Sequence, residues 1–303
     1  MPLVSIIIPN YNHSEFLVQR IESVLAQTFQ DFEVIIMDDC STDNSRSIIE
    51  QYRSHSKVTQ VIFNEINSGS TFKQWSKGLS SARGKYIWFA ESDDWCEPNF
   101  LAYLLEGFEK DSECAISYCQ SYIIEGTNVI RSTSHHGFLS EIQGGKSFLE
   151  NRMFVNNPIF NASMVLWKKE LFQHVSTEFT DYRLCGDWFF WMELCQFGNI
   201  HISGRVLNYF RNHDKDVSGK AMKSGLNFVE TLKVINSFYL RQIISKKVYD
   251  RAFKIQFRAF YPLKNQFSPA VTKEITHLFQ NPLSSKALYY KIYLSAIWKY
   301  KKL

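Results

Sequence analysis

Three carboxylates crowd into the four residues 91–94 (Glu-Ser-Asp-Asp), directly after the apolar run 86–90. Carboxylates at the end of one strand repel each other, and a hard divalent cation would remove that repulsion, particularly while bridging a diphosphate. An acidic loop in which Asp94 caps a helix starting near Pro98 would use the same residues. Taken alone, the run leaves metal binding and helix capping equally open.

A second acidic cluster follows the apolar run 32–37, where Asp38 and Asp39 are joined by Asp43. A turn whose side chains cap a helix beginning near Asn44 accounts for these residues without any ligand. We therefore treat this cluster as informative only together with the other polar clusters of the chain.

The first 110 residues alternate apolar runs with segments of helical periodicity. Strands are expected at residues 3–9, 32–37, 59–63 and 86–90, with helices between them. Asn12 with Glu15 resembles a capping box at the start of the first helix. Strands alternating with helices specify a mostly parallel sheet covered on both faces. This predicts an α/β domain of the nucleotide-binding type, whose ligands bind near the carboxyl ends of the strands, where the polar clusters lie.

The remainder of the chain is less regular. Strands are expected at residues 114–124, 164–167 and 200–211. After Gly219 the pattern becomes helical and basic, with prolines interrupting it. The chain is therefore expected to divide into three parts, residues 1–110, 111–219 and 220–303.

The composition excludes several classes of protein. Of 303 residues, 45% are hydrophobic and 21% charged, which is typical of a globular chain rather than a disordered or fibrous one. No window reaches the roughly 18 apolar residues of a membrane span, and the N-terminal segment lacks the basic leader of a signal peptide. The cysteines form no CxxC pair and no zinc-type cluster, so we expect reduced thiols and a cytoplasmic location.

Charge is distributed unevenly along the chain. Residues 241–303 hold 13 Lys or Arg against two acids, a balance of +11; because the whole chain carries +4, the first 240 residues carry −7. Tyrosines and Trp298 alternate with lysines near the C-terminus, a mixture that suits an anionic membrane surface. A helical face packed on the body and a self-association surface stay open. Nucleic acid binding is disfavoured because no recognised module accompanies the charge.

Five polar clusters follow one another in order along the first 100 residues. They are Pro9-Asn10-Tyr11-Asn12, Asp38-Asp39 with Ser41 and Asp43, Asn67-Ser68-Gly69, Gly84-Lys85-Tyr86, and Glu91-Ser92-Asp93-Asp94 with Pro98. This series closely resembles the inverting GT-A glycosyltransferases of sequence family two. The resemblance implies a GT-A fold, with a mostly parallel central sheet, helices on both faces and a C-terminal helical extension. It also implies that residues 1–110 bind a nucleotide sugar and residues 111–219 bind the acceptor.

The resemblance carries nucleotide-binding residues over to this chain one by one. In such enzymes a proline-and-tyrosine loop holds the base, which matches Pro9, Tyr11 and Asn12. An aspartate after the second strand hydrogen-bonds the edge of the base, often uracil, and Asp39 occupies that position. Lys73 lies in a segment that is one residue longer than the family pattern, and it would face the nucleotide phosphates or be a solvated helix lysine.

The DxD-type motif of the family falls on residues 91–93. Glu91, which stands where the family usually has Asp, and Ser92 would contact the ribose. Asp93 would bind Mn²⁺ or Mg²⁺ on the diphosphate. The late R-x-H segment of the family matches Arg211 and His213, and His213 would reach the metal or the diphosphate. A surface histidine in a loop is the alternative interpretation of His213.

An inverting transferase needs a general base within hydrogen-bond reach of the attacking hydroxyl. The family places this base in an E-D or G-D pair that opens a helix, and Gly186-Asp187 before an aromatic run matches that description. The resemblance therefore implies that Asp187 is the base. A helix cap would use an aspartate at the same position.

The expected function is metal-dependent, inverting transfer of a sugar from a nucleotide-diphosphate sugar, with a UDP-sugar favoured. The acceptor is expected to be a hydroxyl of a glycan or lipid-linked molecule, in cell-surface polysaccharide synthesis at the inner face of the cell membrane. A catalytically inactive GT-A-like nucleotide-binding scaffold and a sugar nucleotidyltransferase stay open, although the latter normally carries a glycine-rich, basic phosphate loop after its first strand. A dinucleotide-dependent dehydrogenase is excluded because no GxGxxG follows a strand.

Overall fold

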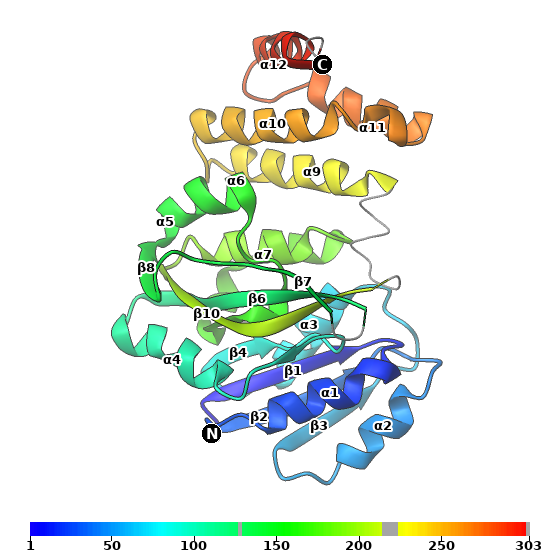
Figure 1. The fold of residues 1–303 in the computed structure, drawn as a ribbon, viewed down its shortest axis with the longest axis vertical. Helices are drawn as coiled ribbons and strands as arrows, with labels where there is room; N and C mark the ends of the chain where they lie inside the picture. Colours follow the sequence, from blue (N-terminus) through cyan, green and yellow to red (C-terminus); the bar gives the residue numbers. More distant parts are fainter. Residues whose placement is uncertain (127–128, 214–223, 301–303) are drawn as a thin grey trace.

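The computed structural model describes residues 1–126, 129–213 and 224–300, with a sheet at one end and stacked helices at the other (Figure 1). β1 lies between β2 and β4 in parallel register, with Val4 opposite both Phe32 and Tyr86, and β3 extends the sheet beyond β2. The strands are β1 (Val4–Asn10), β2 (Phe32–Asp38), β3 (Val58–Phe63) and β4 (Tyr86–Phe89). The helices that connect them are α1 (Ser14–Leu25), α2 (Ser45–Tyr52) and α3 (Thr71–Ser81).

The second half of the chain continues the same sheet. Its main path runs β3-β2-β1-β4-β9-β6-β10-β5, while β7 pairs with β6 and β8 pairs with β10. The added strands are β5 (Trp95–Cys96), β6 (Cys114–Glu125), β7 (Val129–Thr133), β8 (Ser140–Gly144), β9 (Val165–Lys168) and β10 (Asn199–Asn212). Along the main path only β9 and β5 are reversed among the described strands, because β9 pairs antiparallel with both of its neighbours and β5 antiparallel with β10. The mostly parallel sheet that the sequence predicts is confirmed.

The central strands are buried on both faces. All seven residues of β1 and all seven of β2 are buried, as expected for parallel strands covered by helices on each side. α1 contributes Leu17, Ile21 and Val24 to this core, and each such side chain contributes about 1.5–3 kcal/mol by leaving water. The strands therefore end in rigid, well-defined positions, and the loops that follow them hold the polar clusters.

The capping box expected at the start of α1 is wrong. Asn12 has a positive φ of 57°, and its Oδ1 accepts hydrogen bonds from the amides of Thr42 (2.7 Å) and Asp43 (3.3 Å). Asp43 in turn accepts from the amide of Ser14 (2.9 Å), the first residue of α1. The start of α1 is thus satisfied by a loop about 30 residues away rather than by a local box, and Asn12 joins the two loops.

The C-terminal helices stack beyond α7 (Gly186–Leu194), on the side of α7 that faces away from the sheet (Figure 1). These are α9 (Leu226–Leu240), α10 (Lys246–Phe260), α11 (Pro269–Gln280) and α12 (Lys286–Tyr300). The other helices are α4 (Phe100–Lys110), α5 (Gly145–Phe148), α6 (Phe154–Asn156), the π-helix η1 (Leu149–Met153) and the 3₁₀ helices η2 (Ala162–Met164), η3 (Lys169–His174), η4 (Thr177–Asp181) and η5 (Lys264–Gln266). The basic helical segment expected after Gly219 is therefore confirmed over residues 224–300.

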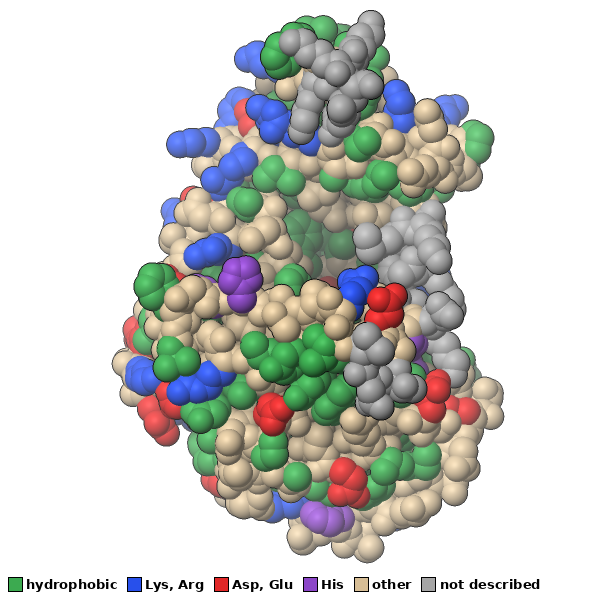
Figure 2. Space-filling model, viewed as in Figure 1, with side chains coloured by type: hydrophobic (Ala, Val, Ile, Leu, Met, Phe, Trp, Pro, Cys, Tyr) green, Lys and Arg blue, Asp and Glu red, His purple; other side chains and the backbone are tan. Residues whose placement is uncertain are grey.

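Buried contacts fasten the C-terminal helices to the rest of the chain. Phe238 of α9 packs edge-to-face against Phe154 and Phe189, with ring centroids 5.7 and 5.2 Å apart. Arg241 donates to both carboxylate oxygens of Glu193 in α7, at 2.8 and 3.0 Å. Lys and Arg side chains are spread over the C-terminal helices on the face seen in Figure 2. Among the described helices, none combines the length and the apolar character needed to cross a bilayer.

Candidate active site

Two adjoining cavities open where β1, β2 and β4 end. The larger, of about 470 Å³, is lined by Pro9, Asn10, Tyr11, Asn12, His13, Asp39, Asn67, Gly69, Ser70, Thr71, Gln74, Glu91, Ser92 and Arg183. The smaller, of about 190 Å³, is lined by His13, Thr71, Phe72, Trp75, Glu91, Asp93, Asp94, Phe160, Asn161, Ala162, Arg183, Leu184, Asp187 and Phe210. Four residues belong to both walls, namely His13, Thr71, Glu91 and Arg183.

The larger cavity brings together most of the residues to which sequence analysis assigned nucleotide binding. They are Pro9, Tyr11, Asn12, Asp39, Glu91 and Ser92. Lys73, the remaining one, lies on the exposed side of α3 and lines neither cavity. This placement follows from the helical period, because its neighbours Phe72 and Gln74 take the buried positions.

Asp39 is a fixed acceptor in the wall of the larger cavity. Its side chain is buried, and Oδ1 accepts from Asn64 (2.6 Å), the amide of Ser68 (2.9 Å) and Gln74 (2.9 Å). The hydroxyl of Ser68 donates to Oδ2 at 2.7 Å. A carboxylate held by this many donors is locked in orientation, and it presents a directional acceptor to a ligand.

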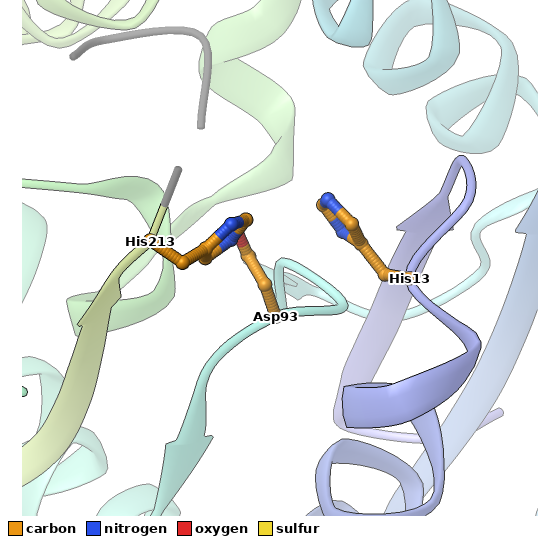
Figure 3. Close-up of side chains that lie close together, drawn as sticks. All are labelled: His13, Asp93 and His213. Carbon is orange, nitrogen blue, oxygen red and sulfur yellow. The ribbon is translucent and has the colours of Figure 1, made fainter. Parts of the chain in front are cut away.

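Three side chains converge beside the smaller cavity at a point where a metal ion could bind (Figure 3). His13 comes from the loop before α1, Asp93 from the loop after β4, and His213 from the segment that follows β10. One ligand atom from each lies within 4.8 Å of the other two. Nε2 of His213 is 3.1 Å from Oδ2 of Asp93, and Nδ1 of His13 is 2.9 Å from the hydroxyl of Ser92.

The chemistry of these three donors fits a divalent cation. Burial by itself would raise the pKa of Asp93, but the hydrogen bond from His213 and the charges of both histidines hold that pKa below its usual value. Asp93 is therefore ionised at neutral pH. One carboxylate with two imidazoles suits Mn²⁺ and other transition ions better than Mg²⁺, which prefers oxygen ligands only.

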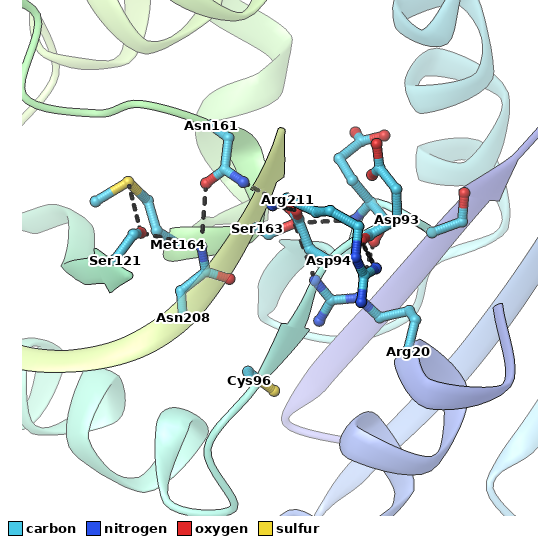
Figure 4. A network of polar contacts seen from close by, with 12 residues as sticks. Arg20, Asp93, Asp94, Cys96, Ser121, Asn161, Ser163, Met164, Asn208 and Arg211 are labelled. Carbon is cyan, nitrogen blue, oxygen red and sulfur yellow. Dashed lines mark hydrogen bonds and ion pairs between the residues drawn. The ribbon is translucent and has the colours of Figure 1, made fainter. Parts of the chain in front are cut away.

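A buried polar network fixes the rest of the acidic run (Figure 4). Asp94 accepts from the amide of Arg211 (3.0 Å) and from Asn161 (2.5 Å), and it lies 3.9 Å from the buried guanidinium of Arg20. The alternative in which Asp94 caps the following helix is wrong, because α4 begins at Phe100. Asp94 instead ties the loop after β4 to β10, and thereby sets the spacing between Asp93 and His213.

Glu91 differs from Asp93 in its charge state. Burial, and then the charge of Asp93, raise the pKa of Glu91 to about 8. Its Oε1 accepts a hydrogen bond from the indole of Trp75 at 2.8 Å. Glu91 therefore keeps its proton at neutral pH while Asp93 carries a negative charge, which avoids repulsion between these two carboxyl groups.

Asp187 lies in the first turn of α7 and lines the smaller cavity together with Asp93. Burial raises the pKa of Asp187 to about 7, and its Oδ1 accepts from the amide of Trp188 at 2.7 Å. Gly186 allows the close approach, because a Cβ there would lie 2.5 Å from both the carbonyl oxygen of Phe179 and the ring of Phe72. A carboxyl group whose pKa lies near neutrality, facing a cavity, is suited to accept a proton.

The family model described as "Glycosyl transferase family 2" matches residues 5–176, more than half of the chain. The chain belongs to glycosyltransferase family 2. Its relatives include glycosyltransferases named for teichuronic acid biosynthesis, for chondroitin synthesis and for transfer to poly(ribitol-phosphate). TuaG of Bacillus subtilis, named for teichuronic acid biosynthesis, is 39% identical over 117 residues, which are 39% of this chain and 46% of TuaG.

Other family 2 glycosyltransferases match longer stretches at lower identity. GlyG of Streptococcus pneumoniae is 30% identical over 178 residues, which are 57% of this chain and 59% of GlyG. An uncharacterised glycosyltransferase of Haemophilus influenzae is 26% identical over 260 residues, 80% of each chain. The chain thus spans about half the length of TuaG and GlyG.

Solved structures share the fold. Staphylococcus aureus TarS 1–349 in complex with UDP-GlcNAc superposes with a TM-score of 0.71 at 19% identity, over 91% of this chain and 80% of that chain. The mannosyltransferase PcManGT from Pyrobaculum calidifontis, in complex with GDP-Man and Mn²⁺, gives a TM-score of 0.55 at 13% identity, over 98% of this chain and 88% of that chain. The GT-A fold expected from the sequence is therefore confirmed.

Sequence reasoning about this family 2 glycosyltransferase missed three of the four residues that line both cavities. His13 directly follows the Pro9–Asn12 loop, so its place in the chain was a usable signal. Thr71 and Arg183 carried no such signal, because Thr71 opens α3 and Arg183 lies in the irregular segment before α7. Both residues reach the cavities only through tertiary packing.

Proposed function

We propose that this chain transfers a sugar from a UDP-sugar to an acceptor hydroxyl, with inversion at the anomeric carbon. The observation that carries the proposal is the order of groups along the two joined cavities. Asp39 lines only the larger cavity, His13 of the three-residue cluster lines both cavities, and Asp93 and Asp187 line only the smaller one. A nucleotide-diphosphate sugar presents its base, its phosphates and its anomeric carbon in that same order.

The preference for a uracil base rests on Asp39 and on the solved structures. The oriented carboxylate of Asp39 is an acceptor for a ring N–H of the base. TarS, with which this chain shares its fold, has been solved with UDP-GlcNAc and with UDP. Tyr11, which is partly exposed beside the cavity, offers a ring on which the base can stack.

His13, Asp93 and His213 would hold the divalent cation. When bound, Mn²⁺ or Mg²⁺ would neutralise charge on the diphosphate leaving group. Asp187 has the other role: its carboxylate accepts the proton of the acceptor hydroxyl as that oxygen bonds to the anomeric carbon. The bond from this carbon to the phosphate oxygen breaks on the opposite face, and the electron pair leaves with the diphosphate.

The acceptor is proposed from the family relatives. TuaG is named for teichuronic acid biosynthesis, and TarS, 38% identical over 101 residues, is named for transfer to poly(ribitol-phosphate). A glycan or a lipid-linked acceptor of the cell envelope is therefore proposed here. A sugar nucleotidyltransferase is disfavoured because the loop after β1 is Tyr11-Asn12 rather than glycine-rich and basic. An inactive scaffold would have no use for the cavity-lining Asp187.

A turnover assay tests the proposal. Purified protein is incubated with Mn²⁺ and a panel of UDP-sugars, and release of UDP is followed with and without envelope glycan acceptors. Product anomers are assigned by NMR. Wild type should release UDP and form the inverted linkage, Asp187→Asn should not, and the exposed Asp181→Asn should match wild type. UDP-sugar binding without turnover, unchanged in Asp187→Asn, would instead favour the scaffold.

We also propose that α12 contacts an anionic membrane surface. Its inner side chains Leu288, Ile292 and Ala296 are buried, yet on the opposite side Tyr290, Leu294 and Trp298 are 64%, 65% and 70% exposed. A helix that is apolar on both sides is expected to be covered on both. Residues 275–303 contain no acid and five lysines, and each basic residue near an anionic bilayer contributes about 1 kcal/mol.

Vesicle sedimentation tests this surface. The protein should sediment with vesicles of phosphatidylcholine and phosphatidylglycerol, less so in high salt, and not with phosphatidylcholine alone. The double variant Leu294→Ser with Tyr290→Ser should abolish binding to the vesicles. The control Ile66→Ser, at an exposed apolar residue distant from α12 in the sequence, should bind as wild type does. Absence of binding to either vesicle would overturn the proposal, and concentration-dependent dimers lost in the double variant would assign the stripe to self-association.

A further inference from the structure

The walls shared by the two cavities, which we call the junction, differ in charge from the rest of the cavity walls. Besides His13 and Glu91, the walls shared by both cavities contain Thr71 and Arg183. Among the described residues that line either cavity, Arg183 is the one Lys or Arg. The carboxyl groups of Asp39, Asp93 and Asp187 line the remaining walls, so an anionic ligand meets a cationic side chain only at this junction.

The first turn of α3 adds to the positive character of the junction. Ser70 and Thr71, at the start of this helix, both line the larger cavity. The amide groups at a helix start have no partner within the helix and carry partial positive charge, which favours phosphate. The hydroxyl of Ser70 is buried and has no hydrogen-bond partner within the described part of the protein.

Arg183 is held in place from the C-terminal helices. Glu230 of α9 is buried, and its carboxylate accepts hydrogen bonds from three successive backbone amides: Arg183 (2.9 Å), Leu184 (2.8 Å) and Cys185 (2.9 Å). The segment 183–185 leads directly into Gly186 and Asp187 at the start of α7. One carboxylate on α9 thus fixes the backbone that carries both Arg183 and the proposed base.

We infer that Arg183 binds the phosphates of the sugar donor, and that Glu230 is the positioning residue that presents it. This inference rests on the proposed function, since it concerns the same donor. Arg183 forms no hydrogen bond or ion pair through its side chain among the described residues, and the side chain is exposed to the cavities. The planar guanidinium can pair with two phosphate oxygens at once.

The arrangement makes the C-terminal helices part of the active site. Glu230 lies in the part of the chain expected to be a separate extension, yet without it three amides next to Asp187 would lack their acceptor. The role of Glu230 is therefore to orient the segment rather than to touch the donor. Arg183 acts on the donor phosphates directly, both while the donor binds and while the diphosphate leaves.

The test compares ligands that differ only in phosphate. Uridine, UMP and UDP are titrated calorimetrically into wild type, Arg183→Gln and the control variant Arg131→Gln. Arg131 is an exposed residue of β7 that lines neither cavity. Each titration is run with Mn²⁺ and with EDTA. Arg183→Gln should lower the affinity for UDP by about 10- to 100-fold, with and without Mn²⁺, as expected for the loss of a charged hydrogen bond. Uridine should bind Arg183→Gln as it binds wild type, and Arg131→Gln should match wild type throughout.

Glu230→Gln separates positioning from folding. It keeps the size of the side chain, and urea unfolding shows whether the variant is folded. It should weaken UDP binding and lower kcat together while uridine affinity stays at the wild-type value, because the segment 183–185 carries Arg183 and leads directly into Gly186 and Asp187. Glu274→Gln, at an exposed glutamate of α11, is the matched control.

Two results are decisive against the inference, and they differ from failure of the proposed function. Equal UDP affinity in wild type and Arg183→Gln overturns the phosphate role of Arg183 while leaving a UDP-sugar donor intact. Wild-type kinetics in Glu230→Gln overturn the positioning role. If wild type itself binds no UDP, the proposed donor is wrong, and Arg183 loses its assignment with it.

Discussion

Asp93 and Asp187 line the same cavity, but their surroundings shift their pKa values in opposite directions. The hydrogen bond from His213 and the charges of two histidines outweigh the effect of burial and lower the pKa of Asp93. Asp187 has only backbone donors, so burial dominates and raises its pKa to about 7. Titratable groups whose surroundings separate their pKa values in this way indicate a division of roles. Asp93 suits a permanent charge beside a cation, and Asp187 suits proton transfer.

Asp187→Asn is expected to reduce kcat by about 10²- to 10⁴-fold, the usual contribution of a general base. The amide fills the same space and can still accept from the amide of Trp188, so the fold and UDP affinity should be kept. The check is a comparison of steady-state turnover with calorimetric UDP binding. Turnover at the wild-type rate would remove Asp187 from the mechanism.

The pH dependence of kcat/KM should follow the ionisation of Asp187. Only the ionised carboxylate accepts a proton, and its pKa is about 7 rather than near 4. kcat/KM should therefore rise with pH through about 7 and level off above it. A profile measured between pH 5 and about 9 checks this expectation. A plateau that already begins at pH 5 would contradict the raised pKa.

At the scale of elements, the candidate site lies in the loops that follow the strand ends, and contacts between residues distant in the sequence fix how these loops are placed. The strands could be predicted because buried parallel strands are continuous apolar runs, and the polar clusters mark where they end. The capping box failed because Asn12 has a positive φ and bonds to residues 42–43, a contact that no local pattern reveals. Arg183 and Glu230 were missed for the same reason, since they meet only after α9 packs against the start of α7.

Gly186→Ala tests how closely α7 must approach its neighbours. A Cβ at this position would lie 2.5 Å from the carbonyl oxygen of Phe179, which is backbone and yields only by shifting the first turn of α7. A shift of about 1 Å at a catalytic group costs about 10²-fold in rate, so kcat should fall by that order. Gly137→Ala, which meets no atom within 4 Å, is the control and should match wild type.

For the whole molecule, the C-terminal helices and the sheet are expected to unfold as one unit. The buried Glu193 of α7 and Arg241 after α9 are joined by two hydrogen bonds, and Phe238 packs into the same interface. The charge imbalance along the sequence predicted a distinct basic segment, and residues 224–300 do form helices. That Glu230 of this segment binds the backbone just before Asp187 could not be inferred from charge, because the contact involves a single buried residue.

Arg241→Met should lower the free energy of unfolding by about 1–3 kcal/mol, because the buried carboxylate of Glu193 loses its charged partner. The side chain of Arg241 is 37% exposed, so water moderates the loss. Lys246→Met is the control: its pair with Asp250 lies on the surface of α10 and contributes less than about 0.5 kcal/mol. Urea unfolding followed by tryptophan fluorescence and by circular dichroism should show one shared transition.

The central claim is that Asp93 and its two histidines bind a cation that binds the donor diphosphate. It is tested by calorimetric titration of UDP, GDP and dTDP, each with and without Mn²⁺, into wild type and Asp93→Ala. We predict that UDP binds most tightly, that Mn²⁺ strengthens its binding, and that Asp93→Ala loses the Mn²⁺-dependent part. Binding of all three nucleotides that is indifferent to Mn²⁺, or unchanged in Asp93→Ala, would contradict the claim.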